Sequence, residues 1–301
     1  MISNNIGRKS KSLWTDNGEG EKVNYTLYEN GYDEAEGVAS GIAEYVRDGW
    51  NYNDVAILYR TNAQSRALEE KLMIHNIPYK IYGGQNFYQR KEIKDILAYL
   101  KTIDNGLDGQ AVKRIINVPK RGIGNTTIDR LQEYADFNDI TFWEALVNAK
   151  DIDTIKNAAL SKLEPFVDLI GRLRAKEEFM SLKELAEAVI EDTGYIESLS
   201  QNETVEEVEA RRENLDEFIN KVVSYEESCK EAGEEPTLSG LLEEVALIAD
   251  IDNLDESEPH VMLMTLHSAK GLEFPIVYMT GMEDGLFPSY MTIVSDDSTE
   301  I

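Results

Sequence analysis

The spacing of apolar and polar residues predicts short strands and helices that alternate at both ends of the chain. Two segments, Asp33–Gly49 and Ser65–Asn76, repeat apolar residues every three to four positions, as amphipathic helices do. Short apolar or alternating runs bounded by polar residues or glycines are typical of strands. These runs are Val23–Asn30, Val55–Arg60, Tyr79–Gly84, Val261–Leu266 and Phe274–Gly281. Strands that alternate with helices indicate an α/β fold with a parallel sheet.

The middle of the chain has a different pattern, because nearly every segment from Glu92 to about Asp250 is helical. No period of about 20–50 residues repeats there, which argues against a solenoid. An acidic stretch then leads back into strands. This order favours an all-α domain inserted into a sheet domain. We expect an extended lead-in at residues 1–20, a sheet domain whose first part is 21–103, the inserted domain at 104–255, and an incomplete second part at 256–301.

Composition limits the classes of function open to the chain. The 301 residues carry a net charge of -27, which favours solubility and opposes broad nonspecific adhesion to nucleic acid. The one cysteine, Cys229, excludes a disulfide framework and a cysteine-rich metal site, and we predict no metal site of any kind. No run of about 18 apolar residues is present, so no segment is expected to span a membrane. A reducing, cytoplasmic location is the simplest interpretation.

One short polar motif separates the last two apolar runs. The sequence TLHSAKGLEF (265–274) places a histidine, a lysine, a glycine and a glutamate directly after a strand. It resembles motif V of the superfamily 1 DNA helicases of the PcrA, UvrD and Rep type. Other stretches resemble parts of the same family in the same order: VAILYRTNAQSRALEE its motif IV, YKIYGGQNFYQRKEIKDILAYL the lead into its inserted helical domain, NVPKRGIGNTTIDRL a signature of that domain, and GMEDGLFPS the segment before motif VI.

The resemblance implies the second RecA-like domain of such a helicase, interrupted by its all-α insertion. No G-x-x-x-x-G-K-[ST] sequence occurs, so this P-loop-NTPase-type domain lacks a P-loop of its own. The acidic pair that holds magnesium and the arginine-bearing motif VI are also missing from the 301 residues. We therefore expect a C-terminal portion, truncated before motif VI, that is inactive alone. ATP and Mg²⁺ are implied for the full-length enzyme, and neither is expected to be bound by this chain.

Tyr59 and Arg60 end a predicted strand, at the edge where open α/β sheets bind ligands. The residues alone favour a plain interpretation, in which Arg60 caps the strand end and Tyr59 packs in the core. The resemblance to motif IV implies instead that Arg60 is a catalytic group that binds the γ-phosphate of ATP, with Tyr59 stacked on the nucleobase. An arginine in that role can raise a rate by about 10³–10⁵.

Thr265, His267 and Glu273 follow the strand before the polar motif. A hydroxyl and an imidazole can hydrogen-bond a DNA phosphate, and a carboxylate can accept a ribose hydroxyl. A lone histidine is usually structural, so the roles come from the resemblance to motif V: Thr265 and His267 bind DNA, and Glu273 binds ATP. Lys270 stays open between a functional group and a solvated loop charge.

A basic segment of the middle region, AVKRIINVPKRGIG (111–124), contains no acidic residue in a chain that has 57. Its glycine turn opens a helix at Thr126 or Thr127, and exposed N–H groups at a helix start bind phosphate. A glycine turn with ordinary surface charge explains the segment equally well. The resemblance to a helix–hairpin–helix signature favours duplex DNA binding, with the candidates Lys113, Arg114, Lys120, Arg121, Gly122, Gly124 and Thr126.

With the family resemblance, these motifs predict part of an ATP-dependent 3′–5′ DNA helicase that acts in DNA repair or replication. The expected partners are single-stranded DNA and the duplex junction, the missing N-terminal RecA-like domain, and repair or transcription proteins bound through the helical domain. The alternative is a non-catalytic protein-interaction module derived from a helicase. The acidic helical segments, such as ETVEEVEARRENLDEF, support that alternative.

Overall fold

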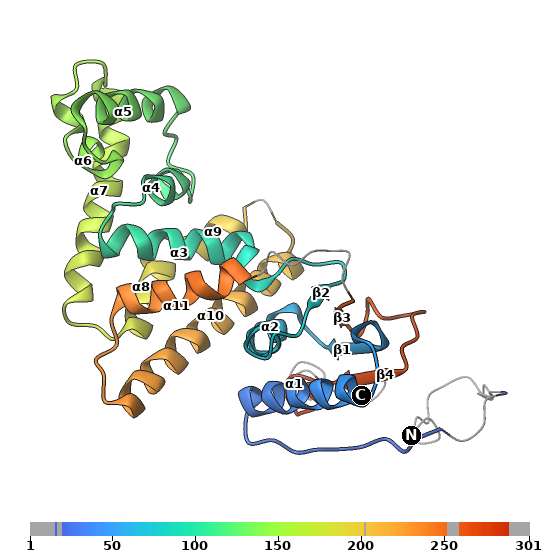
Figure 1. The fold of residues 1–301 in the computed structure, drawn as a ribbon. Helices are drawn as coiled ribbons and strands as arrows, with labels where there is room; N and C mark the ends of the chain where they lie inside the picture. Colours follow the sequence, from blue (N-terminus) through green and yellow to red (C-terminus); the bar gives the residue numbers. More distant parts are fainter. Residues whose placement is uncertain (1–15, 17–19, 202, 252–258, 289–301) are drawn as a thin grey trace.

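A small parallel sheet with two helices and a larger all-helical body make up the computed structural model, which describes residues 16, 20–201, 203–251 and 259–288 (Figure 1). The sheet has the strand order β2-β3-β1-β4, and each neighbouring pair runs parallel. The strands are β1 (Val55–Tyr59), β2 (Tyr79–Ile81), β3 (Val261–Thr265) and β4 (Ile276–Met279). The predicted α/β class with a parallel sheet is confirmed.

The sheet joins segments from both sides of the helical body. On the central strand β1, Ala56 lies opposite Met262 of β3 and Val277 of β4. Next to this pairing, the backbone N–H of His260 donates to the side chain of Asn53, 207 residues earlier in the chain. The segments that lead into β1 and β3 therefore lie side by side at the sheet, although the helical body separates them in the sequence.

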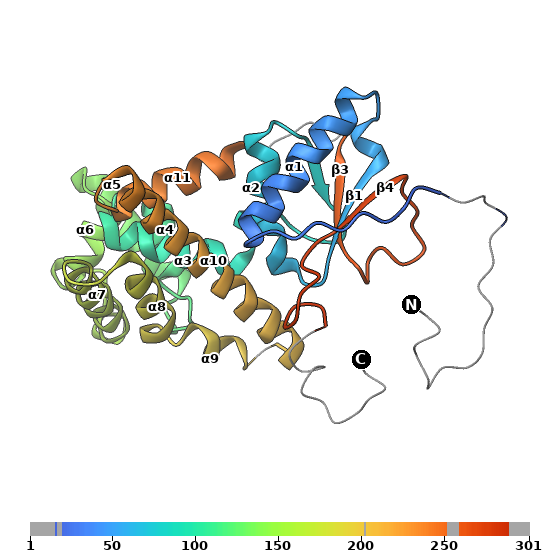
Figure 2. The same ribbon diagram turned by 90° about the horizontal axis from the view of Figure 1, so that it is seen from below.

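Two helices, α1 (Gly31–Arg47) and α2 (Ser65–Ile74), pack on one face of the sheet (Figure 2). The side chain of Asn30 accepts the N–H of Asp33 at 2.9 Å and caps the start of α1. The apolar side chains of both helices and of alternate strand positions form one core. It contains Ala35, Val38, Ala39, Ile42, Val55, Ile57, Tyr59, Leu68, Leu72, Met73, Ile77, Tyr79, Ile81, Val261 and Leu263.

The predicted strand Val23–Asn30 is wrong. Residues 20–30 are extended or bent, but they pair with no strand of the described chain. The alternation that suggested a strand places Val23, Tyr25 and Leu27 on one side, and the first of these is 95% exposed. An alternating pattern forms a strand only where another strand accepts its hydrogen bonds, and here none does.

Helices of very different length build the helical body, and short 3-10 turns lie at several junctions of the chain. The sequence predicted most of the helices, but not α9. The helices are α3 (Lys91–Asp104), α4 (Gly109–Ile115), α5 (Asn125–Asn138), α6 (Phe142–Val147), α7 (Asn157–Glu177), α8 (Leu182–Asp192), α9 (Tyr195–Leu199), α10 (Val205–Ala232) and α11 (Leu238–Ile251), with 3-10 turns at Tyr52–Asp54, Asn62–Gln64, Phe87–Gln89 and Ala149–Asp151.

Helix α3 is the centre of the core of the helical body, because α4, α7, α8, α10 and α11 all contact it. Its residues Ile93, Ile96 and Tyr99 are fully buried there. This core begins at Phe87, whereas the N-terminal part of the sheet-domain core ends at Ile81. By packing, α3 belongs to the helical body, so the two cores divide before α3 and not after residue 103, where the sequence suggested the boundary.

Ion pairs connect α2 to α10. Arg66 is 1% exposed and pairs with Glu70 at 3.0 Å and with Glu217 of α10 at 2.8 Å. Its Nη1 also donates to the hydroxyl of Tyr32 at 2.7 Å. Lys221 of α10 lies 3.6 Å from the second carboxylate oxygen of Glu70. The polar face of α2 is thus buried, and its charges are paired across the contact between the two cores.

A hydrogen-bonded chain continues this contact to the start of α3. Arg90 donates to the Oδ1 atom of Asn214 at 2.8 Å and to the hydroxyl of Ser65 at 2.7 Å. The amide of Asn214 donates in turn to Glu92 at 2.6 Å. One residue of α10 therefore holds both the arginine before α3 and a carboxylate in its first turn.

Candidate functional site

Two of the predicted motifs meet at the carboxyl edge of the sheet. β1 and β3 are adjacent and parallel, with Tyr59 opposite Thr265. The N–H of Leu266 donates to the carbonyl of Tyr59 at 2.8 Å. Arg60 follows β1 and His267 follows β3 by two residues, so both lie where these strands end. This is the edge at which open α/β sheets bind ligands.

Arg60 is exposed, and Gln64 holds its backbone. The Oε1 atom of Gln64 accepts the N–H groups of Arg60 and Thr61, each at 2.9 Å. Burial raises the pKa of Glu213 on α10, whereas a hydrogen bond with Thr61 and the charge of Arg60 lower it. The guanidinium of Arg60 therefore lies within electrostatic reach of α10 and can meet an anion at the sheet edge.

Gln64 was not among the predicted site residues, although it orders this loop. Beyond its bonds to the backbone at Arg60, its amide packs against Gly281, where a Cβ would collide with it. Gly281 has a φ of 66°, which favours glycine, and its N–H donates to the carboxylate of Glu34 at 3.1 Å. A sequence signal was available, since Thr61 and Gln64 have the T-x-x-Q spacing of a capping box.

Tyr59 is fully buried in the core of the sheet domain. Its hydroxyl has no hydrogen-bond partner among the described residues. Burial and the nearby carboxylate of Glu69 raise the pKa of this hydroxyl well above its usual range, and the charge of Arg90 opposes them. The ring has no exposed face for a nucleobase in this structure, so Tyr59 occupies the core position that its residue type alone favoured.

The polar motif after β3 forms a turn that Thr265 closes. Its hydroxyl accepts the N–H of Ser268 at 3.2 Å and lies 2.9 Å from the hydroxyl of Ser268. His267 and Lys270 are exposed on the turn, and Gly271 has a φ of 89°. Thr265 therefore shapes the turn, while the imidazole of His267 is the accessible group.

Glu273 is exposed on the segment that returns from the carboxyl edge to the start of β4. β4 begins with Ile276 opposite Val55, the first residue of β1. Glu273 precedes that start by three residues and follows His267 by six. The structure brings Arg60 and the Thr265–His267 turn together, and Glu273 lies between that turn and β4.

The cationic side chains of the basic segment differ in their exposure and in whether they are already paired. Lys113 is half-buried, with its Nζ 5.2 Å from the centre of the Phe142 ring. Arg114 pairs with the buried carboxylate of Asp95 at 2.7 Å and donates to the carbonyl of Lys91. Lys120 is exposed. Only part of the positive charge expected on this surface is therefore accessible.

Arg121 was predicted to bind DNA, but its guanidinium closes the end of α4. Its Nη1 donates to the carbonyl of Ile115 at 2.9 Å, and its Nη2 donates to the hydroxyl of Tyr99 at 2.6 Å. The guanidinium also lies 5.0 Å from the centre of the Phe166 ring. Carbonyls at a helix end need such donors, and no spacing rule could show that this arginine provides them.

We expect Arg121→Ala to destabilise the protein by about 2–3 kcal/mol, because the carbonyl of Ile115 and the hydroxyl of Tyr99 would each lose a charged donor. Lys120→Ala, one residue earlier, should change the free energy of unfolding by less than about 0.5 kcal/mol, as surface changes do. Urea unfolding followed by circular dichroism measures both. An equal loss of free energy of unfolding in the two variants would contradict the proposal that Arg121 caps α4.

The glycine turn before α5 exposes the start of a helix. Gly122 has a φ of 71°, and its carbonyl accepts the Nζ of Lys162 at 2.7 Å. α5 begins at Asn125 with Gly124 as its N-cap, no side chain caps it, and its first turn has no acidic residue. Thr126 is exposed in that turn. Open N–H groups beside Lys120 and Lys162 form a surface that suits a phosphate.

Lys162 is the cation that sequence reasoning missed at this turn. It lies on α7, 40 residues after Gly122. No local pattern predicts that α7 packs against the turn, so only the fold could identify Lys162 as part of this surface.

Among the described residues, no group of three His, Cys, Asp or Glu side chains could hold a metal ion. In the same part of the chain, no helix is long and apolar enough to cross a membrane.

Comparison with known proteins gives a consistent result. The model of the UvrD-like helicase C-terminal domain family matches residues 1–300. A protein of Staphylococcus aureus named ATP-dependent DNA helicase PcrA is 46% identical over all 301 residues, which are 40% of its own length. A Staphylococcus epidermidis protein of the same name is 44% identical over 301 residues, 41% of its length. The chain thus spans about 40% of the length of these curated relatives.

Proposed function

Because the chain belongs to the UvrD-like helicase C-terminal domain family, we propose that it is part of an ATP-dependent 3′–5′ DNA helicase of the PcrA/UvrD type acting in DNA repair or replication. The observation that carries the proposal is the meeting of Arg60 with the Thr265–His267 turn at one edge of the sheet. An edge that offers a cation for a nucleotide next to groups for a nucleic-acid strand suits an enzyme that couples ATP turnover to DNA movement. We also propose that the protein is located in the cytoplasm.

ATP fits this edge through charge. Arg60 is exposed, its backbone is fixed by Gln64, and it is the residue that would bind the γ-phosphate. Glu273 is exposed and would accept the ribose hydroxyls, whereas the base-stacking role of Tyr59 has no support from its buried position. ATP would supply a phosphoryl group whose developing charge Arg60 neutralises. The P-loop and the carboxylates for Mg²⁺ would come from an N-terminal RecA-like domain.

A chimeric helicase tests the proposal directly. In it, this chain replaces the matching 301-residue segment of the Staphylococcus aureus relative, which leaves that protein's other parts in place. We expect DNA-stimulated ATP hydrolysis and unwinding of a duplex with a 3′ single-stranded tail. A folded chimera without either activity would favour the non-catalytic interaction module instead.

The chain alone is expected to show no ATP turnover, with or without DNA. Arg60 can stabilise a transition state, but it cannot replace the P-loop that the 301 residues lack. Phosphate release from purified protein, with Mg²⁺ present, is the measurement. Turnover that survives further purification and follows the protein through gel filtration would contradict the proposed division of labour.

Duplex DNA is proposed to bind at the start of α5. We expect weak, sequence-independent binding with a log–log salt slope of about -2, because about two phosphates would be neutralised by Lys120 and Lys162. The double variant Lys120→Glu/Lys162→Glu should abolish this binding and stay folded, since both side chains are exposed. Fluorescence anisotropy with a labelled duplex measures the loss.

Lys150→Glu serves as the control for net charge, because Lys150 is an exposed lysine outside the turn. It changes the charge of the chain without touching the start of α5. If that control weakens duplex binding as much as Lys120→Glu alone or Lys162→Glu alone, the turn contributes only general charge.

A further inference from the structure

A groove of about 550 Å³ lies between α3, α4 and α11 on the helical body. Its floor is apolar, and the helices that form its walls contact α3 on two sides (Figure 1). The apolar lining residues are Leu97, Ala98, Ala111, Leu242, Val245 and Ala246. The proposed DNA surface uses the start of α5, so neither it nor the sheet edge accounts for this groove.

Cations surround the apolar floor. Among the residues that the structure describes, Lys94, Lys101, Lys113 and Arg114 line the groove with a single carboxylate, Asp108. The chain as a whole has 57 acidic and 30 basic residues, so this local excess of positive charge runs against the composition. An apolar floor with a basic rim is complementary to a ligand that has an apolar stripe between carboxylates.

The cations differ in how strongly they are already paired. Lys101 lies 3.5 Å from Asp108, and Arg114 is held by Asp95 below the rim. Lys94 is half-buried, and its ammonium forms no hydrogen bond or ion pair with any other described residue. Lys94 is therefore the group most open to a new carboxylate.

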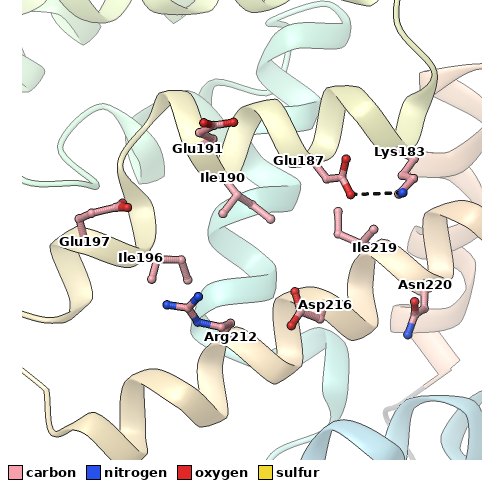
Figure 3. A pocket seen from close by; sticks show the side chains of 10 residues that line it. All are labelled: Lys183, Glu187, Ile190, Glu191, Ile196, Glu197, Arg212, Asp216, Ile219 and Asn220. Atoms are coloured by element: carbon pink, nitrogen blue, oxygen red, sulfur yellow. Dashed lines mark ion pairs between the residues drawn. The ribbon is translucent and has the colours of Figure 1, made fainter.

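Another hollow of the helical body, about 500 Å³ between α8, α9 and α10, has the opposite charge balance (Figure 3). Ile190, Ile196 and Ile219 form its apolar part. Four carboxylates and two cations line the rest, and Lys183 pairs with Glu187 at 3.5 Å. An acidic ligand would be repelled there, so charge separates the two hollows as binding sites.

We propose that the groove between α3, α4 and α11 binds an acidic amphipathic helix of a partner protein. Such helices place apolar side chains at intervals of three and four residues into a groove. Single-stranded nucleic acid would instead need exposed aromatic rings for its bases. Within the described part of the chain, the only ring that lines the groove is that of Tyr88, which is 4% exposed and donates its hydroxyl to Glu70.

A pair of neighbouring positions on α11 gives a matched test. Ala246 lines the groove and Leu247 does not, although both are exposed. The probe is a fluorescein-labelled peptide of about 14 residues, with leucines at helical spacing and glutamates elsewhere. We expect Ala246→Glu to weaken its binding to the whole chain by about fivefold or more, and Leu247→Glu to change it by less than about twofold. Lys94→Glu should weaken it as Ala246→Glu does, and Lys150→Glu should not.

Four results would overturn the inference, three with the peptide and one with a nucleic acid. The acidic peptide does not bind, it binds no better than its lysine-for-glutamate analogue, or Ala246→Glu and Leu247→Glu weaken it equally. Displacement of the peptide by oligothymidine, with the same dependence on Ala246, would assign the groove to nucleic acid. Failure here leaves the proposed helicase function untouched, because none of the changed residues belongs to the DNA or nucleotide surfaces.

Discussion

Arg60→Ala is expected to lower the ATPase rate of the chimeric helicase by about 10³-fold or more. The exposed guanidinium at the sheet edge would meet charge that develops on the γ-phosphate only in the transition state. Loss of such a group lowers kcat and leaves the affinity for ATP much less affected. The loop should keep its conformation in the variant, because Gln64 bonds to the backbone N–H of residue 60 and not to the arginine side chain.

Arg47→Ala provides the matched control for this change. Arg47 is an exposed arginine of the same domain, and among the described residues its side chain pairs only with Glu44, at 3.6 Å on the same helix. Steady-state phosphate release with saturating single-stranded DNA separates the two variants. An Arg60→Ala enzyme within about tenfold of the parent rate would exclude a catalytic role and favour a strand-end residue.

Arg66→Ala is expected to destabilise the protein by about 3–5 kcal/mol. Truncation would leave the carboxylates of Glu70 and Glu217 without their shared cation, and the hydroxyl of Tyr32 without its donor. Lys221 would remain 3.6 Å from Glu70. Its ion pairs are with Glu70 and Glu244, so it does not compensate the charge of Glu217. Removing one partner from a buried ion pair costs far more than the pair contributes, because an uncompensated charge stays behind.

Urea unfolding followed by circular dichroism measures this loss. Arg47→Ala is again the comparison, since exposed ion pairs contribute about 0–1 kcal/mol. A loss below about 1 kcal/mol for Arg66→Ala would mean that water enters the contact between α2 and α10 and solvates the two carboxylates.

The sequence predicted the parallel sheet and most helices because their apolar periodicity is strong and local. The strand proposed at Val23–Asn30 had the same kind of local pattern, yet no neighbouring strand accepts its hydrogen bonds. Local alternation and tertiary pairing are separate requirements. A pattern in one segment cannot report whether the second is met.

The sequence predicted some residues of the candidate site correctly and could not predict others. Motif spacing placed Arg60 and His267 after strand ends, and parallel pairing then brought those ends together. The same spacing could not predict that Arg121 turns inward to cap α4, or that Lys162 comes from α7 to the glycine turn. Whether a cation is free depends on which carbonyls and carboxylates the fold places within its reach.

The bond between His260 and Asn53 also has a consequence for the order of folding. Closing an unstructured chain of 207 residues costs entropy that grows with the logarithm of its length. If the helical body folds first, its two ends already lie together, and the remaining closure resembles that of a shorter loop. Roughly 46 of the 207 residues lie outside Lys91–Ile251, so the difference is about 1.3 kcal/mol. Amide protons of α3 should therefore be protected from exchange before those of β1, which would make the helical body the template on which the sheet assembles.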